Sequence, residues 1–170
     1  VLLQETIQGL SVQNGETVLD ATLGGGGHAS ALCEGKSRIR LIGIDADGEA
    51  LLRAKTKLEL LPRINVITEK ANFRQIDEVL QKHDIHHVDK VLFDLGLGSH
   101  TYESGRGFSV QKDEPLVMTL DDQGGEVTAR AVINEWSEET LADVIYGFGE
   151  ERFAKRIAKA IVLRRAVKAI

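Results

Sequence analysis

Four consecutive glycines and a downstream aspartate are the residues best suited to chemistry in this sequence. Gly24 to Gly27 follow an apolar segment, and Asp45 ends the next one, 21 residues after Gly24. Glycine permits positive φ angles and lets a ligand approach the backbone closely. An acid at the end of the second strand can accept hydrogen bonds from ribose hydroxyls. This order predicts a nucleoside-cofactor site at the carboxyl ends of parallel strands, although the glycines alone would also fit a plain turn.

The residues leave two nucleoside cofactors open. The run Gly24-x-Gly26-x-x-Ala29 fits the fingerprint of NAD-binding domains. Two features favour S-adenosylmethionine instead. Asp20 precedes the glycines, where methyltransferases usually keep an acid, and a helix is expected before the first strand. Asp20 would also fit a plain polar strand end.

Two further candidate residues follow later strands. Phe73 comes after the third expected strand, where an aromatic ring either lies against an adenine or belongs to the core. Asp94 follows the apolar run 91–93. A carboxylate is costly to bury without a partner, and the carboxyl end of a strand in an open α/β sheet faces the ligand crevice. We therefore expect Asp94 to be functional.

The segments that position these residues alternate between strand and helix patterns. This alternation predicts an α/β fold with a parallel sheet and helices on both faces. Asp47 and Ser137 are expected helix caps. Strands are expected at 17–23, 38–45, 64–68 and 88–95, and helices at 2–10, 28–34, 48–60 and 74–83. After these come a glycine-rich loop at 96–107, an irregular stretch at 113–125, and helices at 128–136 and 138–146. A basic helix follows from Glu150, and its apolar face is formed by Phe153, Ile157, Ile161 and Val162.

The composition is that of a globular protein of one ordinary domain. The chain has 170 residues, of which 42% are hydrophobic and 28% charged. It contains no apolar run of the ~18 residues that a membrane span needs and no recognisable signal peptide at its start. The single cysteine, Cys33, suits a reducing compartment, so we expect a cytoplasmic protein. Because the chain starts at Val1 and stops at Ile170 inside an expected helix, we expect a fragment.

The charge is unevenly distributed. The net charge of -5 argues against a general nucleic-acid binder. The last expected helix is nevertheless strongly basic, and its charges fit either RNA phosphate contact or a solvated face. The basic residues are Arg152, Lys155, Arg156, Lys159, Arg164, Arg165 and Lys168.

Several stretches, in order along nearly the whole chain, carry a family pattern. They are Asp20-Ala-Thr-Leu-Gly-Gly-Gly-Gly-His28, Gly43-Ile-Asp45-Ala-Asp47, Asp94-Leu-Gly-Leu-Gly-Ser99, Arg106-Gly-Phe-Ser109, Pro115-Leu-x-Met118-x-x-Asp121 and Gly149-Glu-Glu-Arg-Phe-Ala-Lys-Arg-Ile-Ala-Lys-Ala-Ile161. This pattern resembles the ribosomal RNA small-subunit methyltransferase H family, of the MraW type. The resemblance implies an incomplete Rossmann-like methyltransferase sheet with a helical insertion after the fourth strand. Residues 1–104 would belong to the S-adenosylmethionine-binding domain and residues 105–170 to a substrate-recognition insertion.

The resemblance also implies an activity and its contacts. The family methylates the exocyclic N4 of a cytidine in small-subunit (16S) ribosomal RNA. The segment 97–101 reads Leu-Gly-Ser-His-Thr where the family usually has Val-Ser-Ser-Pro-Gln, and Val117 and Thr119 replace a usual Asp and Arg. The implied cofactor contacts are Gly26, Gly27, His28, Asp45, Phe73, Asp94 and, at the position of the usual glutamine, Thr101.

Asp94 is expected to contact the cofactor first and to serve catalysis second. An acceptor that holds the N–H groups of cytosine N4 would turn its delocalised lone pair toward the methyl group; Asp94 or a carbonyl of 95–98 could do this. Arg106 could touch the base or simply fix its loop. The expected RNA contacts are Arg106, Arg152, Lys155, Arg156 and Lys159.

Other interpretations stay open beside this one. His83, His86 and His87 could suggest a metal site, but a solvated loop is expected there, and no metal. The rival functions are an NAD-binding oxidoreductase domain and a truncated, non-catalytic homologue that binds only cofactor or RNA. The expected partner is small-subunit ribosomal RNA or the assembled subunit, with no membrane. A homodimer through the exposed sheet edge is also expected.

Overall fold

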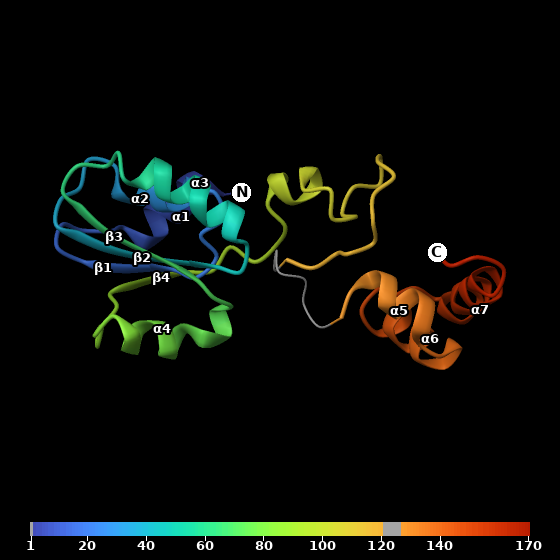
Figure 1. Ribbon diagram of the computed structural model, residues 1–170. Helices are drawn as coiled ribbons and strands as arrows, with labels where there is room; N and C mark the ends of the chain where they lie inside the picture. The colour runs from blue at the N-terminus through green and yellow to red at the C-terminus, as the bar shows by residue number, and fades with distance from the viewer. Residues whose placement is uncertain (1, 121–126) are drawn as a thin grey trace. The chain divides into compact units, whose positions relative to one another are not determined.

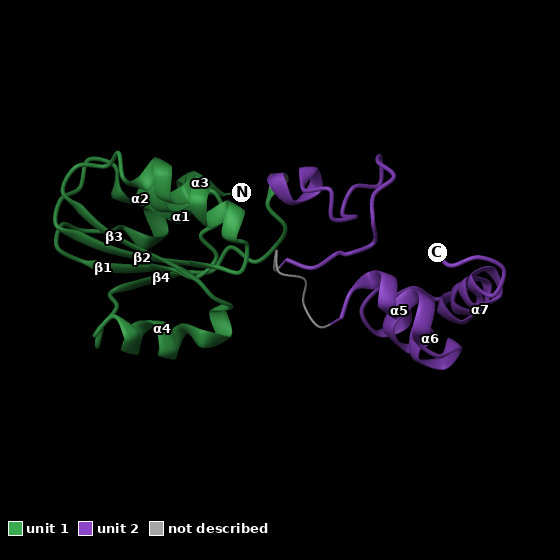
Figure 2. Ribbon diagram, viewed as in Figure 1, with its two compact units in different colours: residues 1–98 green, residues 99–170 purple. Residues whose placement is uncertain are grey.

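The chain folds into two compact units. The computed structural model describes residues 2–120 and 127–170. The units are Val1–Gly98 and Ser99–Ile170 (Figure 2). The predicted boundary between residues 104 and 105 falls inside the second unit, and as a division between cofactor and substrate regions it stays a prediction.

The first unit is a parallel β-sheet covered by helices on both faces. In chain order its elements are α1 (Leu3–Leu10), β1 (Thr17–Asp20), α2 (Gly27–Cys33), β2 (Ile39–Asp45), α3 (Gly48–Leu58), β3 (Ile64–Lys70), η1 (Phe73–Gln75), α4 (Ile76–Lys82) and β4 (Lys90–Leu92). The strands lie in the order β3-β2-β1-β4, and every neighbouring pair is parallel. Figure 1 shows α1, α2 and α3 on one face and α4 on the other. This arrangement confirms the predicted Rossmann-like α/β fold.

Each face of the sheet has its own apolar core. Leu41 of β2 packs with residues of α2 and α3, such as Leu32 and Leu58. Ile42, the next residue of β2, points to the opposite face and packs with Val79 of α4. This alternation along β2 explains why its sequence is apolar on both faces. Cys33 is buried in the first of these cores, and burial raises the pKa of its thiol to about 11.

The first strand is shorter than predicted. Its ladder ends at Asp20 rather than at residue 23, because the Asp20 carboxylate accepts a hydrogen bond from the Thr22 N–H at 3.1 Å and the chain turns there. The Leu23 N–H still donates to the Ile44 carbonyl at 2.9 Å. The glycine loop therefore stays bound to the neighbouring strand β2.

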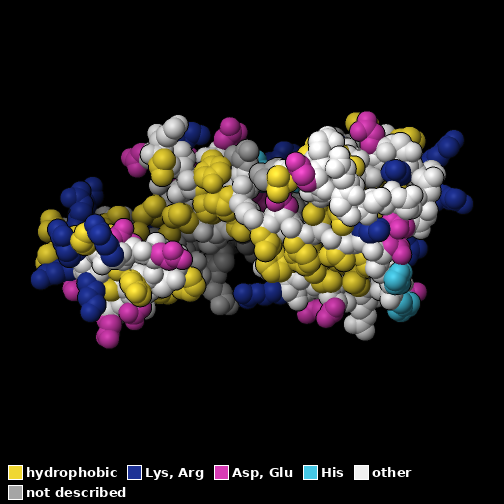
Figure 3. Space-filling view, turned by 180° about the vertical axis from the view of Figure 1, so that it is seen from behind, with side chains coloured by type: hydrophobic (Ala, Val, Ile, Leu, Met, Phe, Trp, Pro, Cys, Tyr) yellow, Lys and Arg dark blue, Asp and Glu magenta, His cyan; other side chains and the backbone are white. Residues whose placement is uncertain are grey.

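The fourth strand is also shorter than predicted, at Lys90–Leu92 instead of 88–95. It lies at the edge of the sheet, and its pairing with β1 ends at the register Asp20↔Leu92. Among the described residues, β4 pairs with β1 and with no second strand. Two residues of the apolar run 91–93, Val91 and Phe93, are exposed. Figure 3 shows a broad hydrophobic surface on this unit.

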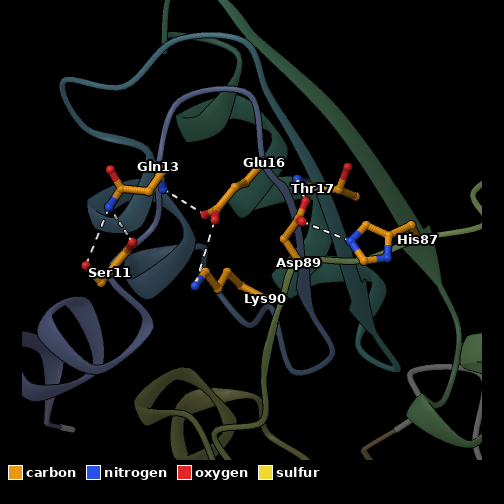
Figure 4. Close-up of polar contacts among 7 residues, drawn as sticks. All are labelled: Ser11, Gln13, Glu16, Thr17, His87, Asp89 and Lys90. Carbon is orange, nitrogen blue, oxygen red and sulfur yellow. Dashed lines mark hydrogen bonds and ion pairs between the residues drawn. The ribbon is translucent and has the colours of Figure 1, made fainter.

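Polar contacts fix the start of β4 against β1 (Figure 4). Asp89 accepts a hydrogen bond from the Thr17 N–H at 2.8 Å, and its other oxygen lies 2.9 Å from Nε2 of His87. Nζ of Lys90 lies 3.8 Å from Oε1 of Glu16 and forms an ion pair with it. The Thr17 amide, with a smaller contribution from His87, holds the pKa of Asp89 below its usual value. These contacts set the register that places Asp94 beyond the strand.

The second unit is mostly helical after its first loop. Its elements are η2 (Ser99–Glu103), α5 (Ala129–Glu135), α6 (Glu138–Gly147) and α7 (Ala154–Arg165). Ser137 caps α6 by accepting from the Thr140 N–H at 3.1 Å, as predicted. Trp136 packs against a small core around Leu141. The predicted irregular stretch 113–125 lies partly outside the described residues.

The helix α7 differs from the prediction in its first residue and in the side chains that it buries. It starts at Ala154 rather than at Glu150, and it buries Ala154 and Ala158, while Phe153 and Ile157 are exposed. Of the predicted face, Ile161 and Val162 pack against the core. Small alanines let α7 pack closely, a signal that a count of large apolar residues misses. No helix in the described ranges is long and apolar enough to span a membrane.

Candidate functional site

Three aspartates lie at the carboxyl ends of three neighbouring strands. Asp20 ends β1, Asp45 ends β2, and Asp94 follows β4. All three belong to the first unit. Carboxyl ends of parallel strands share one edge of the sheet, which is where ligands bind in this class of fold.

Asp45 holds the glycine loop to the second strand. Its Oδ2 accepts from the Gly24 N–H at 2.7 Å, and its Oδ1 accepts from the Asp47 N–H at 2.9 Å. Asp47 in turn caps α3, as predicted, by accepting from the amides of Glu49 and Ala50. Each carboxylate oxygen has a second lone pair, so Asp45 can still accept from a ligand hydroxyl.

The glycine run combines structural and open positions. Gly26 is buried with a φ of 73°, and a Cβ there would lie 3.1 Å from Cβ of Ala54. Both its conformation and the close approach of α3 therefore require glycine. Gly25 and Gly27 are exposed, and a side chain there would meet open space. These two positions leave backbone accessible beside Asp45.

Asp20 is the most perturbed acid of the site. It is buried, and its carboxylate accepts from the Thr22 N–H. Burial raises the pKa of Asp20 to about 6, against the opposing effects of the Thr22 amide and His28. The negative charges of Asp45 and Asp94 raise this pKa further. The carboxylates of Asp45 and Asp94 therefore act electrostatically on Asp20, and the three acids form a negative region.

His28 and Thr22 position Asp94. Nδ1 of His28 lies 3.5 Å from Oδ2 of Asp94, whose side chain is partly exposed. The Asp94 N–H donates to Oγ1 of Thr22 at 2.7 Å. The predicted candidates His28 and Asp94 are thus brought together. Thr22 was missed in the sequence, because nothing in its type or spacing marks it.

An aromatic pair borders the site. The rings of Phe73 and Phe93 meet edge to face, with centroids 6.0 Å apart. Phe73 is 41% exposed and Phe93 is 47% exposed, so Phe73 is not a core residue. Phe93 had been assigned to the fourth strand, and its contact with Phe73 was not predicted. Its position next to Asp94, beyond the last paired residue, is the signal that could have marked it.

A match to a protein-family model identifies the family of this chain. The model described as the MraW methylase family matches residues 1–170. The chain belongs to the MraW methylase family. This membership sets aside the rival interpretation as an NAD-binding oxidoreductase domain.

Two proteins similar to this chain have names that describe ribosomal RNA methylation. The chain is 43% identical to the ribosomal RNA small subunit methyltransferase H of Brevibacillus brevis, across 97% of this chain and 52% of that protein. The chain thus spans about half the length of this curated relative. A solved rRNA methylase from Streptococcus thermophilus is 24% identical, with a TM-score of 0.43, over 59% of this chain and 56% of that one.

The other residues that were predicted to contact cofactor or RNA lie in the second unit. Thr101 is buried, and its carbonyl accepts from the amide and hydroxyl of Ser104. Arg106 donates to the carbonyls of Thr119 and Leu120 at 3.2 and 2.8 Å, which favours its loop-fixing alternative. The cofactor and RNA contacts assigned to these two residues stay predictions. The other predicted RNA contacts, Arg152, Lys155, Arg156 and Lys159, are exposed in the α7 region, as are Arg164 and Lys168.

The histidines near β4 have separate acidic partners. Nε2 of His83 lies 2.6 Å from Oε1 of Glu69, and Nε2 of His86 lies 2.9 Å from Oδ1 of Asp84. His87 contacts Asp89, as described above. Over the described residues, no three His, Cys, Asp or Glu side chains come together to hold a metal ion.

Proposed function

We propose that this protein is an S-adenosylmethionine-dependent methyltransferase that acts on the exocyclic N4 of a cytidine in 16S ribosomal RNA. The observation that carries the proposal is the cluster of three interacting carboxylates around an accessible glycine loop in an MraW family chain. The N4 position and the small-subunit RNA follow from the family resemblance and from the name of the Brevibacillus brevis relative.

The charge of the site supports the choice of cofactor. S-adenosylmethionine carries a sulfonium and an ammonium group, whereas NAD carries an anionic pyrophosphate. Asp45 and Asp94 already oppose ionisation of Asp20. A further anion would add to this repulsion, while a cation would relieve it. The site therefore fits a cationic nucleoside better than a dinucleotide.

Different residues of the site would contact different parts of the cofactor. Asp45 would accept from the ribose hydroxyls, because its carboxylate keeps free lone pairs beside the loop. Phe73 would lie against the adenine ring, since its exposure leaves apolar ring surface available. Gly26 would shape the loop, and the exposed backbone at Gly27 would approach the cofactor. His28 would act through its contact with Asp94.

Catalysis rests on positioning, with S-adenosylmethionine supplying an activated methyl group. Asp94 is held by Thr22 and His28 while its carboxylate remains partly exposed. It would contact the cofactor and would also accept an N–H of the cytosine amino group. That hydrogen bond would orient the N4 lone pair. The target base would have to leave its stack to reach this position.

The partner we infer is small-subunit ribosomal RNA or the assembled subunit. Exposed Arg152, Lys155, Arg156 and Lys159 supply positive charge for phosphates on an otherwise acidic chain. The homodimer through the edge strand β4 and the cytoplasmic location stay predictions.

Methyl transfer to small-subunit RNA that lacks the modification tests this function. The purified protein should place label from methyl-labelled S-adenosylmethionine on cytosine N4. Asp94→Ala should lower the transfer rate by about 100-fold, because the acceptor that positions the amino group is lost. Asp77→Ala, on the exposed face of α4, is the control and should leave the rate unchanged. Label on another atom would contradict the proposal, and cofactor binding without transfer would favour the non-catalytic homologue.

A further inference from the structure

Three exposed aromatic side chains cluster in sequence at the corner between α6 and α7. Tyr146 is 67% exposed, Phe148 is 90% exposed and Phe153 is 43% exposed. Large aromatic surfaces are seldom left in water without a partner when several occur together. The small core of this unit is built from other residues, around Leu141 and Trp136. The corner aromatics therefore contribute little to folding the unit.

The backbone of this corner is well ordered by hydrogen bonds. The amides of Phe148, Gly149 and Glu150 donate to carbonyls in the last turn of α6, at 3.0, 3.1 and 3.0 Å. A Cβ at Gly149 would lie 2.6 Å from the Ile145 carbonyl oxygen, so only glycine fits this turn. The corner is thus preorganised, and presenting Phe148 to a ligand requires little further ordering.

Cationic side chains adjoin these rings. The guanidinium carbon of Arg152 lies 4.5 Å from the centre of the Phe153 ring, and that of Arg156 lies 5.3 Å from it. Both are cation–π distances. Lys155, in the first turn of α7, is also exposed. On this helical part, Figure 3 shows Lys and Arg side chains around exposed hydrophobic ones.

We propose that the corner formed by Tyr146, Phe148 and Phe153 is a stacking platform for unpaired bases of single-stranded RNA. Aromatic rings and guanidinium planes stack on bases that lie outside a duplex, while neighbouring cations hold the phosphates. An apolar protein partner would have to bury the charges of Arg152 and Arg156 without such phosphates. The inference rests on the proposed function, because it assumes an RNA substrate, and it assigns residues that act through stacking rather than charge.

Fluorescence anisotropy with a labelled, unstructured RNA of about ten nucleotides tests the platform, with a duplex of equal length in parallel. Phe148→Ala should weaken binding of the single strand about tenfold without changing the salt dependence, since no charge is lost. The double variant Arg152→Gln/Arg156→Gln should instead flatten the salt dependence. Phe148→Trp should bind as the parent does. Leu52→Ala, which removes an exposed apolar side chain from α3, should also leave binding unchanged.

Each outcome decides the platform separately from the function. Equal binding by Phe148→Ala and the parent, equal affinity for duplex and single strand, or binding of an acidic peptide in place of RNA would overturn the platform. A titration of the same preparation with S-adenosylmethionine reports on the proposed cofactor site, which does not include the three aromatic residues. Cofactor binding without single-strand binding would therefore remove the platform and leave the cofactor site standing. Single-strand binding that depends on Phe148, with no methyl transfer, would instead remove the proposed activity.

Discussion

Asp45→Ala is expected to lose S-adenosylmethionine binding by about 100-fold or more and to destabilise the fold by about 3 kcal/mol. Both effects have one cause, because the carboxylate that would bind the ribose also accepts from the amides of Gly24 and Asp47. Hydrogen bonds to a charged group contribute about 1.5–3 kcal/mol each, and every 1.4 kcal/mol is about tenfold in affinity. Calorimetric titration and urea unfolding measure the two effects.

Two variants separate the affinity from the stability. Asp45→Asn keeps one accepting oxygen, so it should retain more stability than Asp45→Ala while still binding the cofactor weakly. Asp77→Ala removes an exposed carboxylate from the first turn of α4 and should change stability by only a few tenths of a kcal/mol. If Asp45→Ala bound S-adenosylmethionine as tightly as the parent, Asp45 would be only a clamp for the loop.

Asp20 should make the fold less stable as the pH rises. Its folded pKa is about 6, above the ordinary value of 3.8, because burial penalises the carboxylate. A group whose pKa is raised on folding contributes its full stability below its unfolded pKa and loses it as the pH rises through the folded pKa. A shift of about two pKa units corresponds to about 3 kcal/mol. Above pH 6, ionised Asp20 therefore costs stability.

Comparison with Asp20→Asn measures this cost. The amide oxygen of asparagine can still accept from the Thr22 N–H, which Asp20 accepts at 3.1 Å. In urea unfolding, the two proteins should be similar near pH 4, and the variant should become more stable by about 3 kcal/mol above pH 7. A cationic cofactor should offset the cost, so it should stabilise the parent more than the variant at high pH. A stability difference that is constant from pH 4 to pH 8 would be the contrary result.

The parallel sheet and the main acids could be predicted from the sequence, but the order of the strands and the ends of the elements could not. The alternation of apolar segments indicated a parallel sheet, and Asp45 and Asp94 were placed at strand ends by position alone. The sequence does not say which strand lies at the edge. For that reason β4 was predicted too long, and the aromatic pair of Phe93 with Phe73 was not predicted.

The burial of polar and small residues was equally hard to predict. The spacing of Asp20 in the sequence did not predict its burial or its pKa of about 6, because both depend on the tertiary fold around the end of β1. In α7, the apolar positions Phe153, Ile157 and Ile161 predicted one face, but close packing against α6 selected Ala154 and Ala158. Large side chains dominate a pattern count, whereas helix contacts favour whichever residues allow close approach.

The most direct test of the central claim is calorimetric titration of the purified chain with S-adenosylmethionine, S-adenosylhomocysteine and NAD, with Asp45→Ala beside it. The account predicts binding of the two sulfur nucleosides, loss of that binding in the variant, and no binding of NAD. Binding of NAD alone would contradict it, because an anionic dinucleotide would then occupy a site lined by Asp20, Asp45 and Asp94.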